Sequence, residues 1–151
     1  MRYILVDRFL EIEKGVRARA VKCVTLGEPF LNDLPAYPNA LVLEALIQAG
    51  GILTRASSDF ARPTVLGKVD TASFAREAMP GDTIQLEVEI LLARDEGNLC
   101  EGIASVNGEE IARARYLIIY VPADKLPPPD AGVAERRMRL MKALGVVSEE
   151  A

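Results

Sequence analysis

The sequence contains no histidine and no tryptophan among its 151 residues. The missing histidine excludes a Ser-His-Asp triad, a histidine metal ligand and a histidine general base, in one chain and in any homo-oligomer of it. Only two cysteines occur, Cys23 and Cys100, and they do not form a CxxC pair. We therefore expect no disulfide framework, no metal site, no cofactor and a reducing, cytoplasmic location, with both cysteines as buried, unreactive thiols.

The sequence also lacks long apolar runs and an excess of basic residues. Its formal net charge is −4, which gives no electrostatic reason to expect nucleic acid or an anionic membrane as a partner. Asp7 and Arg8 interrupt the opening apolar segment too early for a signal peptide, and no stretch reaches the length of a membrane span. The length and the 50% apolar composition suit one domain with a hydrophobic core.

Segments of alternating apolar and polar residues predict six β-strands. The expected ranges are 3–13, 16–25, 64–74, 83–96, 99–106 and 110–122. Asn107-Gly108 is a strong hairpin signal between the last two, because both residues tolerate positive φ. Alternation is clearest from Ile84 to Ile90, where every second residue is a large aliphatic.

Between the second and third strands, the pattern changes to that of a helix. Residues 39–57 are apolar on nearly every side, which predicts a buried helix, and Asn39 is the expected N-cap. Two strands, one long helix and four strands indicate the α+β class, with a single antiparallel sheet wrapped around one central helix.

The C-terminal part has a different composition. We expect the main domain at 1–122, a proline-rich extended linker at 123–130, and a short amphipathic helix with a tail at 131–151. Asp130 is a candidate N-cap and Gly145 a candidate stop for this helix. Its expected apolar stripe is Ala134, Met138, Met141 and Leu144.

Three segments carry a resemblance to a known family. They are ILVDRFLEIEKGVRARAVKCVTLGEPF, LVLEALIQAGGIL and FAREAMPGDTIQLEVEILLARDEGNLCEGIASVNGEEIARARYLI. Their order and spacing resemble the FabZ-type 3-hydroxyacyl-acyl-carrier-protein dehydratases over about residues 2–121. The resemblance implies the hotdog fold and substrates that are acyl thioesters of acyl carrier protein or CoA.

The sequence departs from this family in the loop before the helix. The family pattern is G-H-F-P-G-x-P-x-M-P-G, whereas this chain reads Asn32-Asp33-Leu34-Pro35-Ala36-Tyr37-Pro38 and continues directly into Asn39-Ala40. Asp33 occupies the histidine position, the Met-Pro-Gly piece is missing, and the loop is about three residues shorter. The helix glutamate of the family is retained as Glu44.

In the family, the histidine removes the α-proton, the helix glutamate handles the departing β-hydroxyl, and backbone N–H groups at the helix start hold the thioester oxygen. The resemblance therefore makes Glu44 and Asp33 the candidate catalytic residues. The candidate substrate-binding residues are Asn39, Ala40, Leu41, Gln48 and Phe74. An aspartate, with an ordinary pKa near 3.9, is a poorer base than imidazole at neutral pH, so we expect a homo-oligomer to dehydrate weakly or not at all.

Three functions stay open. The first is a dehydratase homologue with impaired or partner-dependent activity: family sites take the histidine from one subunit and the glutamate from the other, so Glu44 would complete a site in a heterodimer with a histidine-bearing homologue. The second is an acyl-CoA or acyl-carrier thioesterase, because Asp33 and Glu44 around the helix start also resemble hotdog thioesterases. The third is a non-catalytic acyl-binding subunit.

Each of these functions has a structural alternative at the residue level. Asp33 is more typical of a turn former in the proline-rich loop. For Glu44, the alternative to a catalytic role is a helix carboxylate paired with an arginine or a surface group, although a charged residue on an otherwise apolar helix favours function. The basic residues of the C-terminal helix either face solvent or meet an acidic carrier protein. A homodimer, or a higher oligomer of dimers, is the expected assembly.

Overall fold

A computed structural model describes residues 4–29, 31, 33–128 and 130–148 of the chain. Within these residues, six strands form one antiparallel sheet in the order β1-β2-β4-β5-β6-β3. The strands are β1 (Arg8–Glu13), β2 (Arg17–Cys23), β3 (Thr64–Phe74), β4 (Thr83–Arg94), β5 (Gly97–Val106) and β6 (Glu109–Tyr120). Helix α1 (Asn39–Ser57) follows β2, and a 3₁₀ turn η1 (Ala123–Lys125) and helix α2 (Ala131–Ala143) follow β6.

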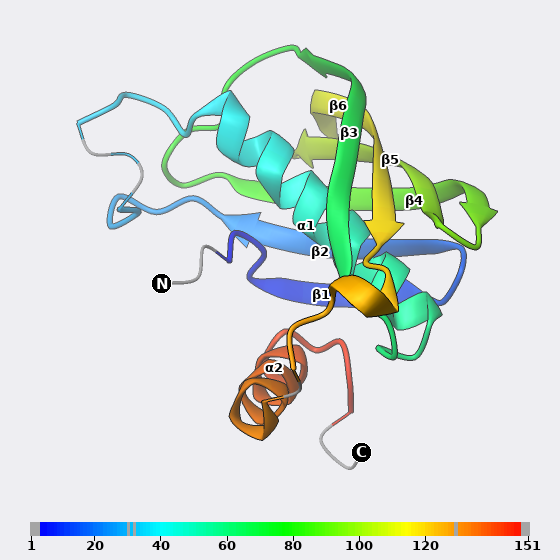
Figure 1. The fold of residues 1–151 in the computed structure, drawn as a ribbon. Helices are drawn as coiled ribbons and strands as arrows, with labels where there is room; N and C mark the ends of the chain where they lie inside the picture. The colour runs from blue at the N-terminus through cyan, green and yellow to red at the C-terminus, as the bar shows by residue number, and fades with distance from the viewer. Residues whose placement is uncertain (1–3, 30, 32, 129, 149–151) are drawn as a thin grey trace.

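The sheet curls around α1, with β1 and β3 as its two edges (Figure 1). Its inner face and the helix form the core, in which Val42, Leu46 and Leu53 of α1 are fully buried. The alternation along β4 explains the layering, since Ile84, Leu86 and Val88 are buried whereas the residues between them are exposed. The predicted arrangement of one antiparallel sheet around one central helix, with a short C-terminal helix, is confirmed.

Three predicted local signals are confirmed by the structure. Asn107 and Gly108 both have positive φ, 50° and 80°, as a tight hairpin turn requires. The Asp130 side chain caps α2 by accepting a hydrogen bond of 2.9 Å from the Gly132 amide. Gly145 follows the end of α2 with a φ of 76°.

Two predictions about α1 are wrong. Asn39 is not the N-cap: Pro38 takes that position without a side-chain hydrogen bond, and Asn39 is the first helical residue, with its Oδ1 buried and unpartnered. The helix is also not buried on every side, because Ala40 and Glu44 are exposed.

Among the described residues, α1 is long and apolar enough to cross a membrane by length and composition alone. Half of it is buried, as in the core helix of a folded domain, so this is weak evidence for a span.

Two further predictions are only partly right. Cys100 is buried, and this burial raises the pKa of its thiol to about 11, but Cys23 is exposed because the alternation of β2 turns it outward. Of the predicted apolar stripe at α2, Met141 and the C-cap residue Leu144 are buried, whereas Ala134 and Met138 are exposed. The helix packs on the domain through its C-terminal end, where the Phe9 amide donates to the Leu144 carbonyl at 2.8 Å.

Gly50 and Gly51 of α1 provide a test of the core packing. A Cβ on Gly50 would lie 2.5 Å from the hydroxyl of Tyr116. Tyr116 is fully buried, and its hydroxyl donates a hydrogen bond to the Leu46 carbonyl. A Cβ on Gly51 would have Thr64 Oγ1 as its one neighbour within 4 Å, at 3.9 Å. Gly50→Ala should therefore lower the free energy of unfolding by about 1–3 kcal/mol through overpacking. Gly51→Ala should raise it by up to about 1 kcal/mol through helix propensity.

Urea denaturation at one fixed protein concentration measures both changes. Equal effects of the two substitutions would contradict the role of Gly50 in admitting the Tyr116 ring.

Candidate functional site

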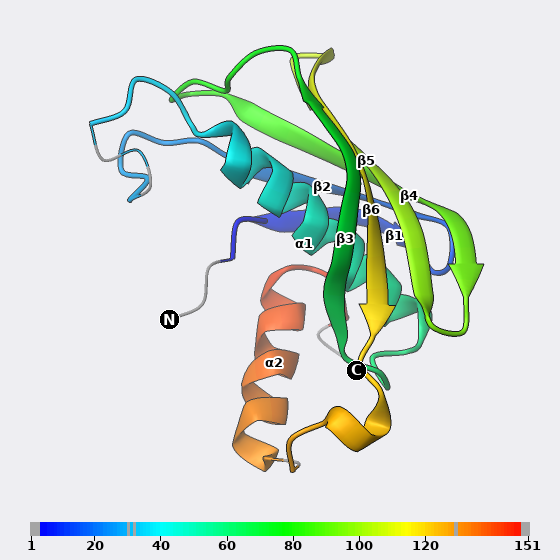
Figure 2. The same ribbon diagram turned by 45° about the horizontal axis from the view of Figure 1, so that its top comes forward.

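One face of α1 is left uncovered by the sheet. It carries Ala40, Glu44, Gln48 and Ile52, which recur every four residues and therefore lie one above another. In Figure 2 the N-terminal half of α1 is open on this side, and α2 lies beside the C-terminal half. Three of the candidate residues, Ala40, Glu44 and Gln48, thus share one accessible surface.

Glu44 is held in place by its neighbour one turn along the helix. Gln48 Nε2 donates to Glu44 Oε1 at 3.2 Å, and Gln48 Oε1 accepts from the Leu5 amide at 2.9 Å. The carboxamide is fixed at both ends, so it orients the carboxylate without neutralising it. No ion pair in the described part of the chain involves Glu44, but its hydrogen bond to the half-buried Gln48 also fits the alternative of a carboxylate paired with a surface group.

The start of α1 offers backbone donors beside this carboxylate. The Leu41 amide already bonds to the Pro38 carbonyl at 2.9 Å, whereas the amides of Asn39 and Ala40 precede the hydrogen bonds of the helix. The first turn contains no acidic residue, and the helix dipole places partial positive charge there. An oxygen that develops negative charge would be stabilised at this end.

Asp33 lies in the loop between β2 and α1, exposed and with a φ of 71°. The Leu34 amide donates to the Leu31 carbonyl at 2.6 Å, which places Asp33 within a turn, a role that aspartate tolerates at positive φ. Among the described residues, no hydrogen bond or ion pair joins Asp33 to Glu44. Asn32 lies outside the described residues.

The loop is anchored at both ends by buried groups. Lys22 Nζ lies 2.8 Å from Glu28 Oε2, and both side chains are only 8% exposed. The Tyr37 amide donates to the Ala78 carbonyl at 2.8 Å, and burial raises the pKa of the Tyr37 hydroxyl. Lys22 Nζ also lies 5.8 Å from the centroid of the Tyr37 ring. These contacts fix the path of the chain into α1.

The structure brings Asn39, Ala40, Leu41, Glu44 and Gln48 together on α1. Phe74, the remaining candidate, ends β3 at the edge of the sheet, where it pairs with Ala112 of β6 and is 39% exposed. In the described part of the chain, no group of three or more His, Cys, Asp or Glu residues could hold a metal ion.

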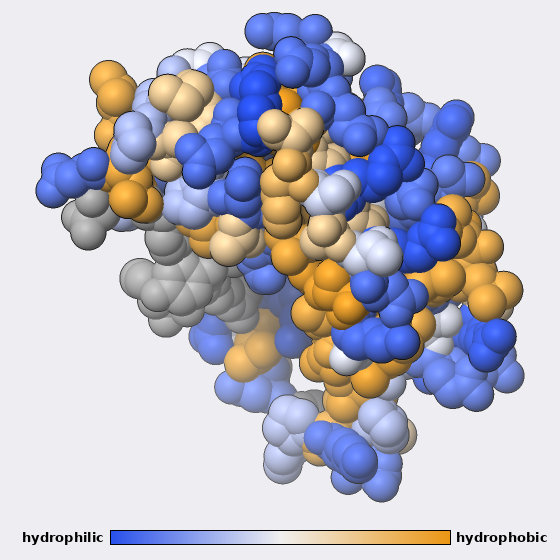
Figure 3. All heavy atoms as spheres, turned by 90° about the horizontal axis from the view of Figure 1, so that it is seen from above, coloured by the Kyte–Doolittle hydropathy of each residue, from blue (hydrophilic) through white to orange (hydrophobic). Residues whose placement is uncertain are grey.

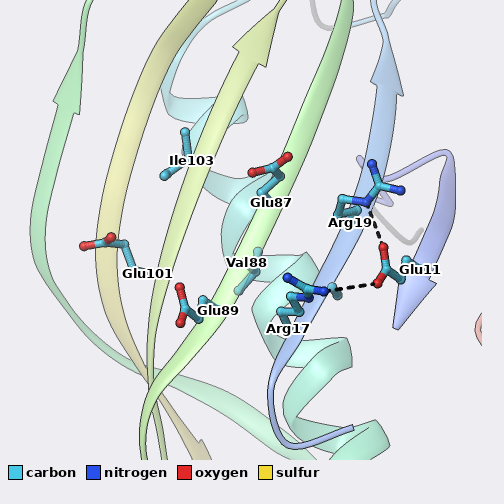
Figure 4. A pocket seen from close by; sticks show the side chains of 9 residues that line it. Glu11, Arg17, Arg19, Glu87, Val88, Glu89, Glu101 and Ile103 are labelled. Carbon is cyan, nitrogen blue, oxygen red and sulfur yellow. Dashed lines mark hydrogen bonds and ion pairs between the residues drawn. The ribbon is translucent and has the colours of Figure 1, made fainter. Parts of the chain in front are cut away.

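Two hollows differ in character. The first, of about 360 Å³, lies on the outer face of the sheet across β1, β2, β4 and β5 (Figure 4). Its charged residues pair across the strands, with Arg19 Nε 3.0 Å from Glu11 Oε2. Exposed ion pairs of this kind contribute little to stability, and a surface of paired charges does not favour binding of an apolar acyl chain. Helix α1, with the candidate residues, lies on the other side of the sheet, so this hollow is not part of the candidate site.

The second hollow continues from the candidate site. It has about 270 Å³ and lies between the uncovered face of α1, the start of β3 and α2. Gln48 lines it, as do Leu140 and Met141 of α2, which the sequence did not indicate as site residues. The amphipathic pattern of α2 was the available signal, but it does not say where the helix packs.

Comparison with known proteins agrees with the geometry. The model of the FabA-like domain matches residues 1–115. The chain is 37% identical over 120 residues to the 3-hydroxyacyl-[acyl-carrier-protein] dehydratase FabZ of Geobacillus thermodenitrificans, an alignment that covers 76% of this chain and 83% of that one.

Solved structures share the fold at low identity. The dehydratase heterocomplex ApeI:P from Xenorhabdus doucetiae has a TM-score of 0.71 and 17% identity, covering 81% of this chain and 86% of that one. A hypothetical thioesterase protein with coenzyme A from Streptococcus pneumoniae has a TM-score of 0.65 and 9% identity, covering 76% and 87%. The predicted hotdog fold is confirmed, and the chain belongs to the FabA-like domain family, among the homologues of the FabZ-type 3-hydroxyacyl-acyl-carrier-protein dehydratases.

Proposed function

We propose that this chain acts in the dehydration of 3-hydroxyacyl thioesters, as in fatty-acid or polyketide-type synthesis, and that it does so in complex with a histidine-bearing homologue. Two observations together support the proposal: Glu44 is retained, oriented by Gln48 and accessible, and the sequence has no histidine. The chain keeps the acid and the helix start but lacks the base.

The chemistry divides between two subunits. The partner's histidine removes the α-proton of the bound 3-hydroxyacyl thioester, and the amides of Asn39 and Ala40 hold the thioester oxygen, on which negative charge develops. Glu44 is the group that delivers a proton to the β-hydroxyl, which leaves as water while the α,β double bond forms. Gln48 positions Glu44 and takes no proton itself.

The edge of the sheet supports assembly with a second hotdog subunit. Among the described residues, β3 pairs with β6 alone, so its other side has backbone groups without a strand partner there, and nearly the whole strand is exposed. Its exposed apolar residues are Val65, Leu66, Val69 and Phe74. Figure 3 shows apolar side chains gathered in a band amid the hydrophilic surface. Pairing of β3 with the same strand of a second subunit would cover this edge, and the heterocomplex among the structural neighbours is consistent with a mixed pair.

Val69→Lys tests this assembly. Lysine on an exposed strand edge disfavours edge-to-edge pairing, so the variant should shift from dimer towards monomer in analytical ultracentrifugation at micromolar concentration. Val16→Lys is the matched control, because Val16 is 42% exposed, close to the 37% of Val69, but lies in the β1–β2 turn. A Val69→Lys protein that stays as dimeric as the control would contradict an interface at β3.

The function itself is tested by mixing. The chain and a histidine-bearing FabZ-type homologue are co-expressed, and the dehydration of a 3-hydroxyacyl thioester is followed for each protein alone and for the purified mixed complex. The chain alone should show no turnover above background, whereas the purified mixed complex should dehydrate the thioester, because its one complete site pairs the partner's histidine with Glu44. Failure of the complex to form, or a purified mixed complex without turnover, would overturn the proposal.

A thioesterase is the second candidate. It is favoured by two exposed carboxylates, Asp33 and Glu44, which form no ion pair with the residues that the structure describes, and by the thioesterase among the structural neighbours. Release of free thiol from a panel of acyl-CoA and acyl-carrier thioesters measures it. Tight binding without either reaction would instead indicate a non-catalytic acyl-binding subunit. In all three cases we infer a cytoplasmic site of action.

A further inference from the structure

The second hollow, beside α1, is a cavity that opens to solvent, is lined mostly by apolar residues and is bounded on one side by α2, a part of the chain outside the sheet. Most of its walls are supplied by Ile52 of α1, by Val65 and Leu66 of β3, and by Leu140, Met141 and the following C-cap residue Leu144 at the end of α2. Its volume of about 270 Å³ is near the lower end of small-molecule pockets, roughly 300–1,000 Å³. A space of this character suits a hydrocarbon group and offers little to a polar one.

The cavity begins where the candidate site ends. Gln48, which hydrogen-bonds to Glu44, is also a wall residue, and Ile52 and Arg55 continue the wall along the same face of α1. From Gln48 to Arg55 the helix rises by roughly 10 Å, at 1.5 Å per residue. A thioester with its reacting carbons beside Glu44 would therefore direct its acyl tail along this face into the cavity.

The end of α2 is held firmly at this position. Met141 and Leu144 are each 4% exposed, and the Val146 amide donates to the Met141 carbonyl at 2.9 Å. Leu140 is half-buried and faces the cavity, whereas Met138 is 43% exposed on another side of the helix. The helix thus presents one fixed apolar surface to the space between α1 and β3.

We infer that α2 forms the far wall of the acyl pocket and limits the length of the acyl chain that the protein accepts. This inference rests on the proposed function, because the occupant is the tail of a thioester bound at Glu44. Each methylene that enters the cavity should improve affinity by about fourfold until the chain reaches Leu140. A longer chain would have to displace α2.

Substitution of Leu140 tests the wall directly. Non-hydrolysable acyl-pantetheine analogues of increasing chain length are titrated into the full-length protein by calorimetry. Leu140→Trp should shorten the longest well-bound chain by two or more methylenes, with a loss of at least about tenfold for chains beyond that limit and no change for short ones. Leu140→Ala should move the limit the other way. Met138→Trp adds the same bulk outside the cavity and should leave the length profile as in the unchanged protein.

The possible failures are distinguishable. If the unchanged protein binds acyl analogues but the Leu140 variants keep its length profile, α2 does not limit the chain and this inference is overturned while the proposed function stands. If analogues of no length bind the unchanged protein, both are overturned. Thermal unfolding of each variant shows whether α2 and the core remain folded. Leu140→Trp and Leu140→Ala should shift the longest well-bound chain in opposite directions, and a loss of stability cannot produce both shifts.

Discussion

Glu44→Gln is expected to lower kcat of the mixed complex by about 10²–10⁴-fold, the usual contribution of a general acid or base. Glutamine has the shape of glutamate, and its carbonyl oxygen can still accept the hydrogen bond that Gln48 donates at 3.2 Å. What it cannot do is give a proton to the departing hydroxyl. The substitution should therefore leave thioester binding nearly unchanged and remove the chemical step.

The measurement is steady-state kinetics of the mixed complex, with the Kd of an unreactive thioester determined in parallel. Glu89→Gln is the matched control, since Glu89 is an exposed glutamate on the outer face of β4, across the sheet from α1. Its kcat should equal that of the unchanged complex. If Glu44→Gln and Glu89→Gln behave alike, Glu44 is not the acid of this site. A fall in binding without a fall in kcat would make it a positioning residue.

Lys22→Ala is expected to lower the free energy of unfolding by about 3–5 kcal/mol, because it leaves Glu28 as an uncompensated buried charge. The alternation of β2 turns Lys22 towards the inner side of the sheet, where its Nζ lies 2.8 Å from Glu28 and 3.9 Å from Asp7. The same pair anchors the loop that leads into α1. Losing it should also disturb the helix start, and with it the binding of the thioester.

Chemical denaturation gives the energy, and two comparisons isolate its cause. Arg139→Ala removes an exposed pair within α2, whose side chains are 76% and 65% exposed, and should cost less than about 1 kcal/mol. Replacing Lys22 and Glu28 together by Met and Leu should recover most of the loss, since no charge is then left buried. A Lys22→Ala protein as stable as Arg139→Ala would contradict the buried pair.

Much of the fold was predictable because local pattern and tertiary structure agree. The strand expected at 64–74 is observed as Thr64–Phe74, and the Asn107-Gly108 turn has the positive φ angles that its residues suggested. These features depend on side-chain period and on intrinsic backbone preference. Glu44 and Gln48 were also predictable as a pair, since four residues bring two side chains together on any helix.

Other features depend on contacts between distant segments. The Leu5 amide fixes Gln48 across 43 positions of the sequence, and no local pattern announces that bond. The end of α2 packs beside α1 and β3, so only half of its predicted stripe is buried. Asn39 was misassigned because Pro38, with no side-chain donor or acceptor, takes the cap position. The position of α2 beside the candidate site is therefore the feature that the structure shows and the sequence could not predict.

The most direct test of a shared active site is half-site complementation. The histidine-bearing partner is given a glutamine in place of its own helix glutamate, which removes every complete site from its homodimer. Mixed with this chain, it should regain dehydration, because Glu44 supplies the missing acid to the partner's histidine, and the gain should be lost again with Glu44→Gln. A mixed complex that forms but stays inactive would contradict the central claim that this chain contributes the acid of a composite dehydratase site.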